Sequence, residues 1–223
     1  MGFAALDPSY DWGIITGLAA EARIARHLGV TRTAGATPAG SVSASKRLII
    51  DGARALLSFG LAGGLDPALR SGMLVIPRKV LAAGEQFTPD PAMIDVLGGP
   101  TIELALGGTE IVPDADAKRC LWEQTDASAV DLESGAVARV AREHGLPFAV
   151  LRAVCDPAER NLPPAALLAL DRRGSIRLLT MLASVAAKPS QIPELMALAR
   201  DAAAARRALI RRVAEIRQRL AGM

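Results

Sequence analysis

The spacing of hydrophobic and polar residues along the chain predicts strands that alternate with helices. Apolar runs typical of buried strands occur at residues 12–17, 55–59, 73–82, 101–106, 128–132 and 148–154, with further strand-like runs at 39–45, 47–50 and 110–112. Helical segments are expected at residues 18–28, 91–97 and 114–122 and from about 134 to 145. This alternation favours an α/β sheet over a helical bundle or a β-sandwich.

The C-terminal quarter predicts one arginine-rich helix over about residues 200–221. Leu209, Val213, Ile216 and Leu220 recur at intervals of four, three and four residues, which places them on one stripe of a helix. The arginines that surround this stripe are Arg206, Arg207, Arg211, Arg212, Arg217 and Arg219. One interpretation is a surface helix docked on the sheet with solvated arginines. The other is a helix that also touches an anionic membrane surface.

Composition narrows the class of protein. With 223 residues, of which 51% are hydrophobic, the chain can bury a sizeable core, and its net charge of +3 is not that of a polycation. Aromatic residues make up 3%, too few to stack successive bases, so we expect no nucleic-acid partner. The N-terminus lacks the pattern of a signal peptide, and the apolar run at 176–187 is too short to span a bilayer.

The two cysteines, Cys120 and Cys155, form neither a disulfide framework nor a metal-binding spacing. We therefore expect a reduced, cytoplasmic protein.

Two carboxylates stand at the ends of apolar runs. Glu133 follows the run at 128–132, and Asp156 follows the run at 148–154, with an amphipathic helical segment between them. A strand, a helix and a strand with right-handed crossover bring both strand ends to one edge of a sheet, where ligands bind in open α/β folds. The spacing therefore predicts two acids in one crevice, which suits acid catalysis.

Several blocks of the sequence resemble one family. They are Gly-Ile-Ile-Thr-Gly at 13–17, Phe-Gly-Leu-Ala-Gly-Gly-Leu-Asp-Pro at 59–67 with its continuation at 71–77, Val-Asp-Leu-Glu at 130–133 and Arg-Ala-Val-Cys-Asp at 152–156. In this order they are similar to the purine nucleoside phosphorylase and nucleosidase superfamily, in its small methylthioadenosine nucleosidase branch. Residues 157–167 are more specifically similar to the hopanoid-associated nucleoside phosphorylases.

The resemblance implies a single α/β domain over residues 1–223, with a central mixed sheet flanked by helices. It also implies that Asp156 is the acid that protonates the leaving purine and that Glu133 holds the ribose hydroxyls. Apart from the family resemblance, Asp156 can be interpreted as a turn or capping residue before Pro157. Glu133 can likewise be interpreted as a favourable negative charge in the first turn of a helix. The substrate-binding residues that it implies are Gly60, Leu61, Ala62, Glu110, Ile111, Val112, Leu132 and Cys155.

The residues that would handle the nucleophile depart from the family's pattern. Ala22 falls on the position that activates water in the nucleosidases, and Glu21 is the nearest acid. Ser58 and Leu61 stand where the phosphorylases carry an arginine and a serine, and Arg23 is the nearest base from the first loop. We expect the site for water or phosphate to comprise Gly17, Glu21, Arg23 and Ser58.

We therefore expect an enzyme that releases adenine from a 5′-substituted purine ribonucleoside, with adenosylhopane as the substrate that the hopanoid resemblance implies. Hydrolysis is favoured over phosphorolysis because the phosphate-binding pattern is missing. The alternatives are a general purine nucleoside phosphorylase, an inactive nucleoside-binding module and a membrane-associated adaptor. The resemblance implies no metal and no organic cofactor, and it implies a homo-oligomer. The arginine-rich helix suggests contact with the inner face of the membrane.

Overall fold

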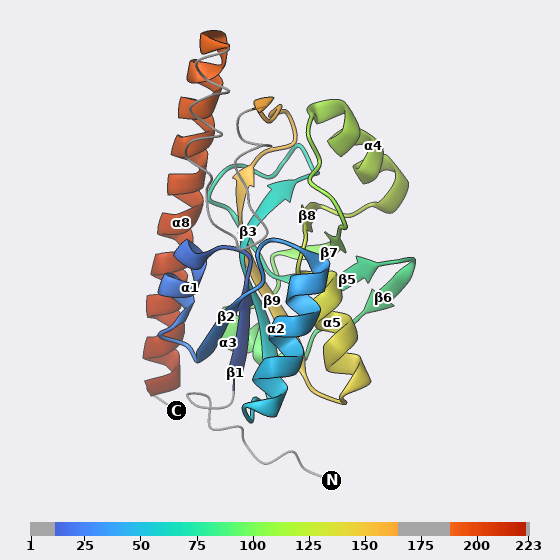
Figure 1. The fold of residues 1–223 in the computed structure, drawn as a ribbon, viewed down its shortest axis with the longest axis vertical. Helices are drawn as coiled ribbons and strands as arrows, with labels where there is room; N and C mark the ends of the chain where they lie inside the picture. Colours follow the sequence, from blue (N-terminus) through green and yellow to red (C-terminus); the bar gives the residue numbers. More distant parts are fainter. Residues whose placement is uncertain (1–11, 165–187, 222–223) are drawn as a thin grey trace.

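A mixed sheet forms the centre of the computed structural model, which describes residues 12–164 and 188–221 (Figure 1). Its strands are β1 (Trp12–Thr16), β2 (Val30–Thr33), β3 (Ala55–Gly64), β4 (Leu74–Val75), β5 (Pro77–Ala82), β6 (Glu85–Phe87), β7 (Ile102–Gly107), β8 (Ala129–Asp131) and β9 (Phe148–Asp156). The strand order is β2-β1-β3-β8-β7-β5-β6, and β9 pairs with β3 and β4. This arrangement confirms the predicted α/β fold with a mixed sheet.

Helices cover both faces of the sheet (Figure 1). On one face lie α1 (Ala19–Ala25), α3 (Pro91–Leu97) and α8 (Ile192–Ala221), and on the other lie α2 (Pro38–Ile50) and α5 (Ser134–Glu143). The remaining described helices are α4 (Ala115–Thr125) and the 3-10 turn η1 (Pro189–Gln191). The central strands are buried on both faces, so Ile14 of β1 joins one core cluster and the next residue, Ile15, joins the other.

The long strand β3 determines where the site lies. Its first half pairs in parallel with β1 and β9, and its last residues pair in antiparallel with β8, with Gly63 opposite Val130. Because β8 runs opposite to β9, the predicted parallel βαβ unit is wrong. Gly63 is also the partner of Asp156 on its other side. The end of β3 therefore passes between β8 and β9 and brings Glu133 and Asp156 to one place.

Several predicted strands have other structures. The runs at 39–45 and 47–50 form the single helix α2, because Thr37 accepts a hydrogen bond from Gly40 N at 3.1 Å and Pro38 occupies the first turn. The buried face of α2 carries small side chains, which weaken its hydrophobic period. Residues 110–112 form no strand, and the run at 73–82 is split into β4 and β5.

Helix α8 begins at Ile192, earlier than the expected start near residue 200. Its 30 residues span about 45 Å, and Figure 1 shows it running the length of the molecule. Leu209, Val213 and Ile216 pack in the same core cluster as Ile14. None of the described helices is long and apolar enough to cross a membrane. The apolar run at 176–187 lies outside the described residues.

A contact between two glycines fixes the start of α5 on the sheet. A Cβ atom on Gly107 of β7 would lie 2.5 Å from the Cα atom of Gly135, which is closer than carbon atoms can approach. The two backbones meet directly because neither residue carries a side chain. Glu133, which precedes α5, is held against the ends of β7 and β8 as a result.

Candidate functional site

A cavity of about 540 Å³ lies where the ends of β1, β3, β8 and β9 meet α1, α4 and α8. The predicted site residues that line it are Gly17, Glu21, Leu61, Ala62, Glu110, Ile111, Val112, Leu132, Glu133, Cys155 and Asp156. Residues from five segments of the chain therefore meet in one place, including both predicted catalytic carboxylates.

Three predicted residues do not line the cavity. Ser58 is buried behind it, where its Oγ atom accepts a hydrogen bond of 2.6 Å from Arg152 Nη2. A Cβ atom on Gly60 would lie 2.7 Å from Glu21 Oε1, so this glycine lets side chains pack against the backbone. Arg23 is exposed on α1.

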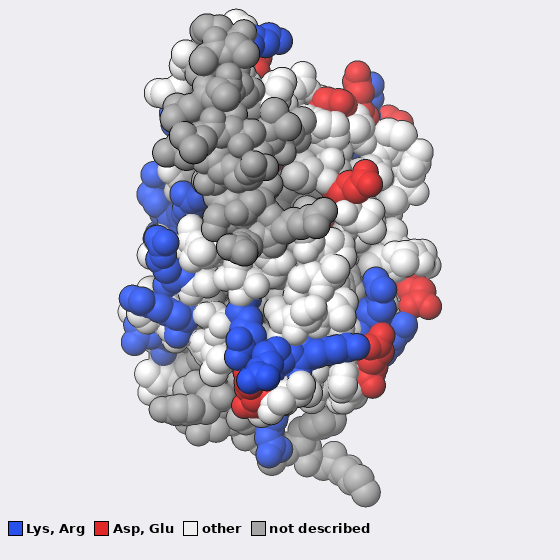
Figure 2. Space-filling model, viewed as in Figure 1, with Lys and Arg blue, Asp and Glu red and all other residues white. Residues whose placement is uncertain are grey.

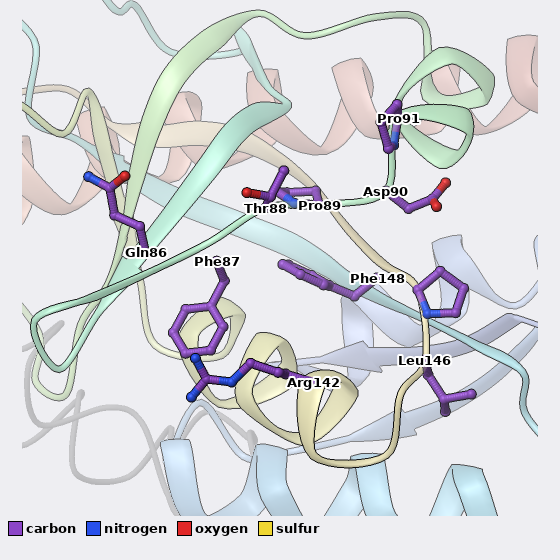
Figure 3. A pocket seen from close by; sticks show the side chains of 10 residues that line it. Gln86, Phe87, Thr88, Pro89, Asp90, Pro91, Arg142, Leu146 and Phe148 are labelled. Atoms are coloured by element: carbon purple, nitrogen blue, oxygen red, sulfur yellow. The ribbon is translucent and has the colours of Figure 1, made fainter.

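A second cavity, of about 390 Å³, lies beside the segment between β6 and α3 (Figure 3). The charged residues that line it are Asp90 and Arg142. Arg142 stacks on the Phe87 ring at 4.4 Å and forms an ion pair with Glu85 at 2.6 Å, while Asp90 caps α3 by accepting from Met93 N at 2.9 Å. Because both charged groups already stabilise local structure, the larger cavity is the candidate site.

Arg152 of β9 is the centre of a buried charge cluster at one part of the larger cavity. Its side chain is 1% exposed. Nη1 lies 2.8 Å from Glu133 Oε2, and Nη2 lies 3.1 Å from Asp131 Oδ1. Together with the hydrogen bond from Nη2 to Ser58, these contacts give both terminal nitrogen atoms of the guanidinium a partner. Arg152 therefore fixes the position of Glu133 and neutralises part of the local negative charge.

Asp131 connects this cluster to the start of α5. Its Oδ1 atom accepts hydrogen bonds from Glu133 N at 2.8 Å and Ser134 N at 2.7 Å, and its Oδ2 atom accepts from Ser134 Oγ at 2.6 Å. These bonds satisfy backbone donors at the helix N-terminus that have no partner within the helix. The Asp-Leu-Glu-Ser sequence at 131–134 therefore caps α5 and orients Glu133 with the same carboxylate.

Glu21 enters the cavity from α1 and is 2% exposed. Its Oε2 atom accepts a hydrogen bond from Leu18 N at 2.7 Å, and its Oε1 atom accepts one from Leu61 N at 3.0 Å. The first bond caps α1, in which Glu21 is the third residue. Glu21 is thus the carboxylate of α1 that lines the cavity, one residue before Ala22, and Ala22 is not among the lining residues.

Two carboxyl groups in this cluster, those of Glu133 and Glu21, have raised pKa values. Burial raises the pKa of Glu133 to about 7, against the lowering effect of Arg152 and with further increases from Asp131 and Glu21. Burial also raises the pKa of Glu21, while Arg152 and the hydrogen bonds from Leu18 and Leu61 lower it. One guanidinium faces three carboxyl groups, so ionising all of them in a buried site is unfavourable. A carboxyl group with a raised pKa is suited to act as a general base near neutral pH.

Asp156 lies in the same cavity and has a different partner. Its Oδ2 atom is 2.8 Å from Lys118 Nζ of α4, and its buried Oδ1 atom has no hydrogen-bond partner among the described residues. Burial raises the pKa of Asp156, while Lys118 and Arg160 lower it and Asp201 raises it further. Asp156 therefore lines the cavity with one carboxyl oxygen bound to Lys118 and the other buried and without a partner among the described residues.

Cys155 also lines the cavity. Burial raises the pKa of its thiol to about 12, and Asp156 and Glu21 add to this effect. The thiol therefore stays protonated and is a poor nucleophile at neutral pH. Among the described residues, no group of three or more His, Cys, Asp and Glu side chains is placed to hold a metal ion.

The sequence analysis missed several residues of this site. Arg152 and Asp131 belong to the family blocks, and a charged residue within the apolar run at 148–154 is a sign of a buried ion pair. Lys118 gave no such signal, because its helix carries many polar residues. The wall contributed by α8 was also missed, and it consists of Leu195, Leu198, Ala199, Ala202 and Arg206.

Comparison with known protein families matches residues 81–213, more than half of the chain, to the phosphorylase superfamily. Comparison with curated protein sequences finds no match.

Solved structures with the same fold include several nucleosidases. A 5′-methylthioadenosine/S-adenosylhomocysteine nucleosidase from Helicobacter pylori, crystallised with butyl-thio-DADMe-Immucillin-A, is 16% identical, with a TM-score of 0.64 over 93% of this chain and 98% of that chain. An S-adenosylhomocysteine nucleosidase from Streptococcus pyogenes is 17% identical, with a TM-score of 0.62 over 87% and 98%. Futalosine hydrolase from Helicobacter pylori is 15% identical, with a TM-score of 0.61 over 87% and 98%.

Proposed function

Because the chain belongs to the phosphorylase superfamily, we propose that it cleaves the N-glycosidic bond of a purine ribonucleoside and releases adenine. The observation that carries this proposal is that one cavity contains a carboxylate held by an arginine, Glu133, and a carboxyl group with a free buried oxygen, Asp156. Glycosidic bond cleavage needs both groups, since the base must be protonated and the sugar gains positive charge.

In the proposed reaction Asp156 Oδ1 transfers its proton to N7 of the base. The bond between the ribose C1′ and N9 breaks, and its electron pair goes to the base. The positive charge that develops on the ribose is stabilised by Glu133, which binds the 2′- and 3′-hydroxyl groups. Glu21 removes a proton from the water molecule that attacks C1′. The wall formed by Leu61, Ala62 and the segment at 110–112 encloses the base.

Hydrolysis fits the charges of the cavity better than phosphorolysis. The cations among the described lining residues are Lys118, Arg152 and Arg206. Lys118 and Arg152 are engaged by carboxylates of the protein itself. Arg206 of α8 is the remaining described cation of the lining that could hold phosphate. The water-activating role is therefore assigned to Glu21.

Glu21→Gln should lower the rate of adenine release about a hundredfold in phosphate-free buffer, because an amide cannot accept the proton of water. The measurement is free adenine and the free sugar, which is ribose from adenosine and 5-methylthioribose from 5′-methylthioadenosine, each with and without phosphate. Glu103→Gln on the exposed face of β7 is the matched control. Ribose 1-phosphate as the main product would show that the enzyme is a phosphorylase, and no adenine under any condition would indicate a binding module.

We further propose that the nucleoside carries a large apolar 5′ substituent, as in adenosylhopane. The support is the α8 wall, in which Leu195, Leu198, Ala199 and Ala202 form an apolar stripe over about two turns of helix. The residues at 157–167 that resemble the hopanoid-associated phosphorylases include Leu162, which also lines the cavity. Burial of a long apolar group would contribute up to about 0.8 kcal/mol for each methylene.

The outer face of α8 fits a membrane surface that would present such a substrate. Figure 2 shows Lys and Arg side chains gathered over the side of the molecule where α8 and α1 lie. The exposed residues of α8 include Arg200, Arg207 and Arg211, which follow one line of the helix, with Met196 and Ile210 beside them. We propose that this face of α8 contacts anionic lipid at the inner side of the membrane.

We also propose that the protein acts as a homo-oligomer. Sedimentation analysis can measure its oligomeric state.

Replacing Arg207 and Arg211 together by glutamine should reduce cleavage of a lipid-linked adenosine in anionic vesicles about thirtyfold, since about 1 kcal/mol is expected for each basic residue near the surface. Cleavage of soluble 5′-methylthioadenosine should not change. The measurement is kcat/KM for both substrates, together with vesicle sedimentation. Arg78→Gln with Lys79→Gln on β5 is the control with equal charge change. Equal losses on both substrates would mean that the arginines stabilise the fold.

A further inference from the structure

Lys118 is a fully buried lysine on α4 whose ammonium group is held from three sides. Nζ lies 2.8 Å from Asp156 Oδ2 and donates hydrogen bonds of 2.9 Å to the backbone oxygen atoms of Pro157 and Arg160. These three partners account for the three donors of the ammonium group. A lysine is rarely buried to this extent without a specific partner, because removing its charge from water is costly. The geometry therefore leaves Lys118 little freedom to move.

This arrangement distinguishes the two oxygen atoms of Asp156. Oδ2 faces a group that donates hydrogen bonds, so the proton of a neutral Asp156 belongs on the other oxygen atom. Oδ1 is that atom, and it is buried without a partner among the described residues, in a side chain that lines the cavity. Lys118 thus fixes the orientation of the carboxyl group and leaves Oδ1 as the oxygen atom that can carry its proton.

We propose that Lys118 is the positioning residue that orients Asp156 and strengthens it as the acid of the reaction. This inference rests on the proposed function and assigns a role to a residue on α4, outside the strands that carry the two acids. When Asp156 Oδ1 gives its proton to the base, the O–H bond breaks, an N–H bond forms and the carboxyl group becomes a carboxylate. That negative charge develops 2.8 Å from a fixed ammonium group, which stabilises it as the proton leaves.

The charged groups around Asp156 come from three elements. Lys118 belongs to α4, Arg160 to the segment after β9, and Asp201 to α8. Arg160 and Asp201 form an ion pair of 2.6 Å, so their opposite effects on Asp156 largely cancel. Lys118 is therefore the group whose charge sets how strongly Asp156 holds its proton, against the burial that raises its pKa.

The test replaces Lys118 by methionine, glutamine and arginine. Loss of the charge in K118M and K118Q should move the basic limb of kcat/KM by about one to three pH units to higher pH, because an opposite charge at this distance lowers a carboxyl pKa by that amount. At neutral pH, turnover should fall at least about tenfold. K118R keeps the charge and should keep the limb in place. Lys79→Met, an exposed lysine of β5, is the control.

Two further measurements separate this role from simple packing. In an Asp156→Asn background K118M should cause no additional loss of turnover, since Lys118 acts through Asp156. Carbon-13 NMR of labelled aspartate measures the pKa of Asp156 directly, and the Asp156→Asn variant assigns its signal. The pKa of Asp156 should be higher in K118Q than in the wild type.

The NMR measurement needs no substrate, so it tests the role of Lys118 even if the wild type releases no base. A wild type that releases no base would refute the proposed function and not the role of Lys118. An unmoved titration in folded K118Q, or a further loss of turnover in the Asp156→Asn background, would overturn the role of Lys118. If K118M does not fold, K118Q carries the test, because it keeps a donor for the two backbone oxygen atoms.

Discussion

Asp156→Asn should lower turnover at least about a hundredfold, up to about ten thousandfold, while the fold and nucleoside binding remain intact. Asparagine keeps the shape of the side chain, but its amide cannot protonate a leaving base. The amide oxygen can still accept a hydrogen bond from Lys118 in place of Asp156 Oδ2, so the pair is altered rather than removed.

The measurement is kcat for adenine release, together with the dissociation constant of adenine. Asp95→Asn on the exposed side of α3 is the control, since it makes the same chemical change away from the cavity. Turnover close to that of the wild type would exclude Asp156 as the acid, and a loss of adenine binding alone would show that it reads the base.

Glu133→Gln should lower kcat by about 10²–10³, the effect of losing one electrostatic contact that forms mainly in the transition state. Binding of free adenine should change little, because adenine has no ribose. The same substitution should also make the protein more stable in alkaline solution.

The direction of the stability effect follows from the pKa of Glu133, which burial raises from 4.5 to about 7. The folded protein therefore binds more protons than the unfolded chain between these two values. The stability that the proton provides is complete below about pH 4.5, declines as the pH rises to about 7 and is absent above it. Glutamine cannot ionise, so the variant should gain up to about 3 kcal/mol relative to the wild type at pH 8.

Urea unfolding at pH 5 and at pH 8 measures this difference, with the exposed Glu103→Gln variant as the control. A variant that is equally destabilised at both pH values would mean that Arg152 keeps Glu133 ionised in the folded protein and that the gain predicted from its pKa is wrong.

The fold could be predicted from the sequence as far as residue periodicity determines it. Buried strands such as β1 and β9 are apolar on both faces and were located to within two residues. Periodicity does not give strand direction, so the sequence could not show that β8 runs opposite to β9. The sequence predicts strands where α2 lies, because most buried positions of this helix carry alanine and serine, whose small size gives a weak hydrophobic pattern.

The residues of the candidate site could be predicted where a reactive side chain stands in a short sequence motif. Glu133 and Asp156 stand in short motifs, and the structure brings both to one cavity. Lys118 and the α8 wall depend on contacts between distant segments, which no local pattern specifies. Lys118 contacts a residue 39 positions away along the chain, and its own helix carries several other charged and polar residues. The family pattern places Ala22 at the water-activating position, and the structure shows that the neighbouring Glu21 caps its own helix and lines the cavity.

The pairing of Arg152 with Ser58 has a consequence for how the protein acquires activity during folding. These residues are 94 positions apart, and Glu21 and Leu61 are 40 positions apart, so the charge cluster closes long loops of the chain. Closing such loops costs conformational entropy before the new contacts compensate for it, which slows the formation of distant pairings. A chain that has formed β1, α1 and α2 still lacks the guanidinium that holds Glu133. Enzymatic activity is therefore expected to return only with the last step of refolding, after most of the helical structure has formed.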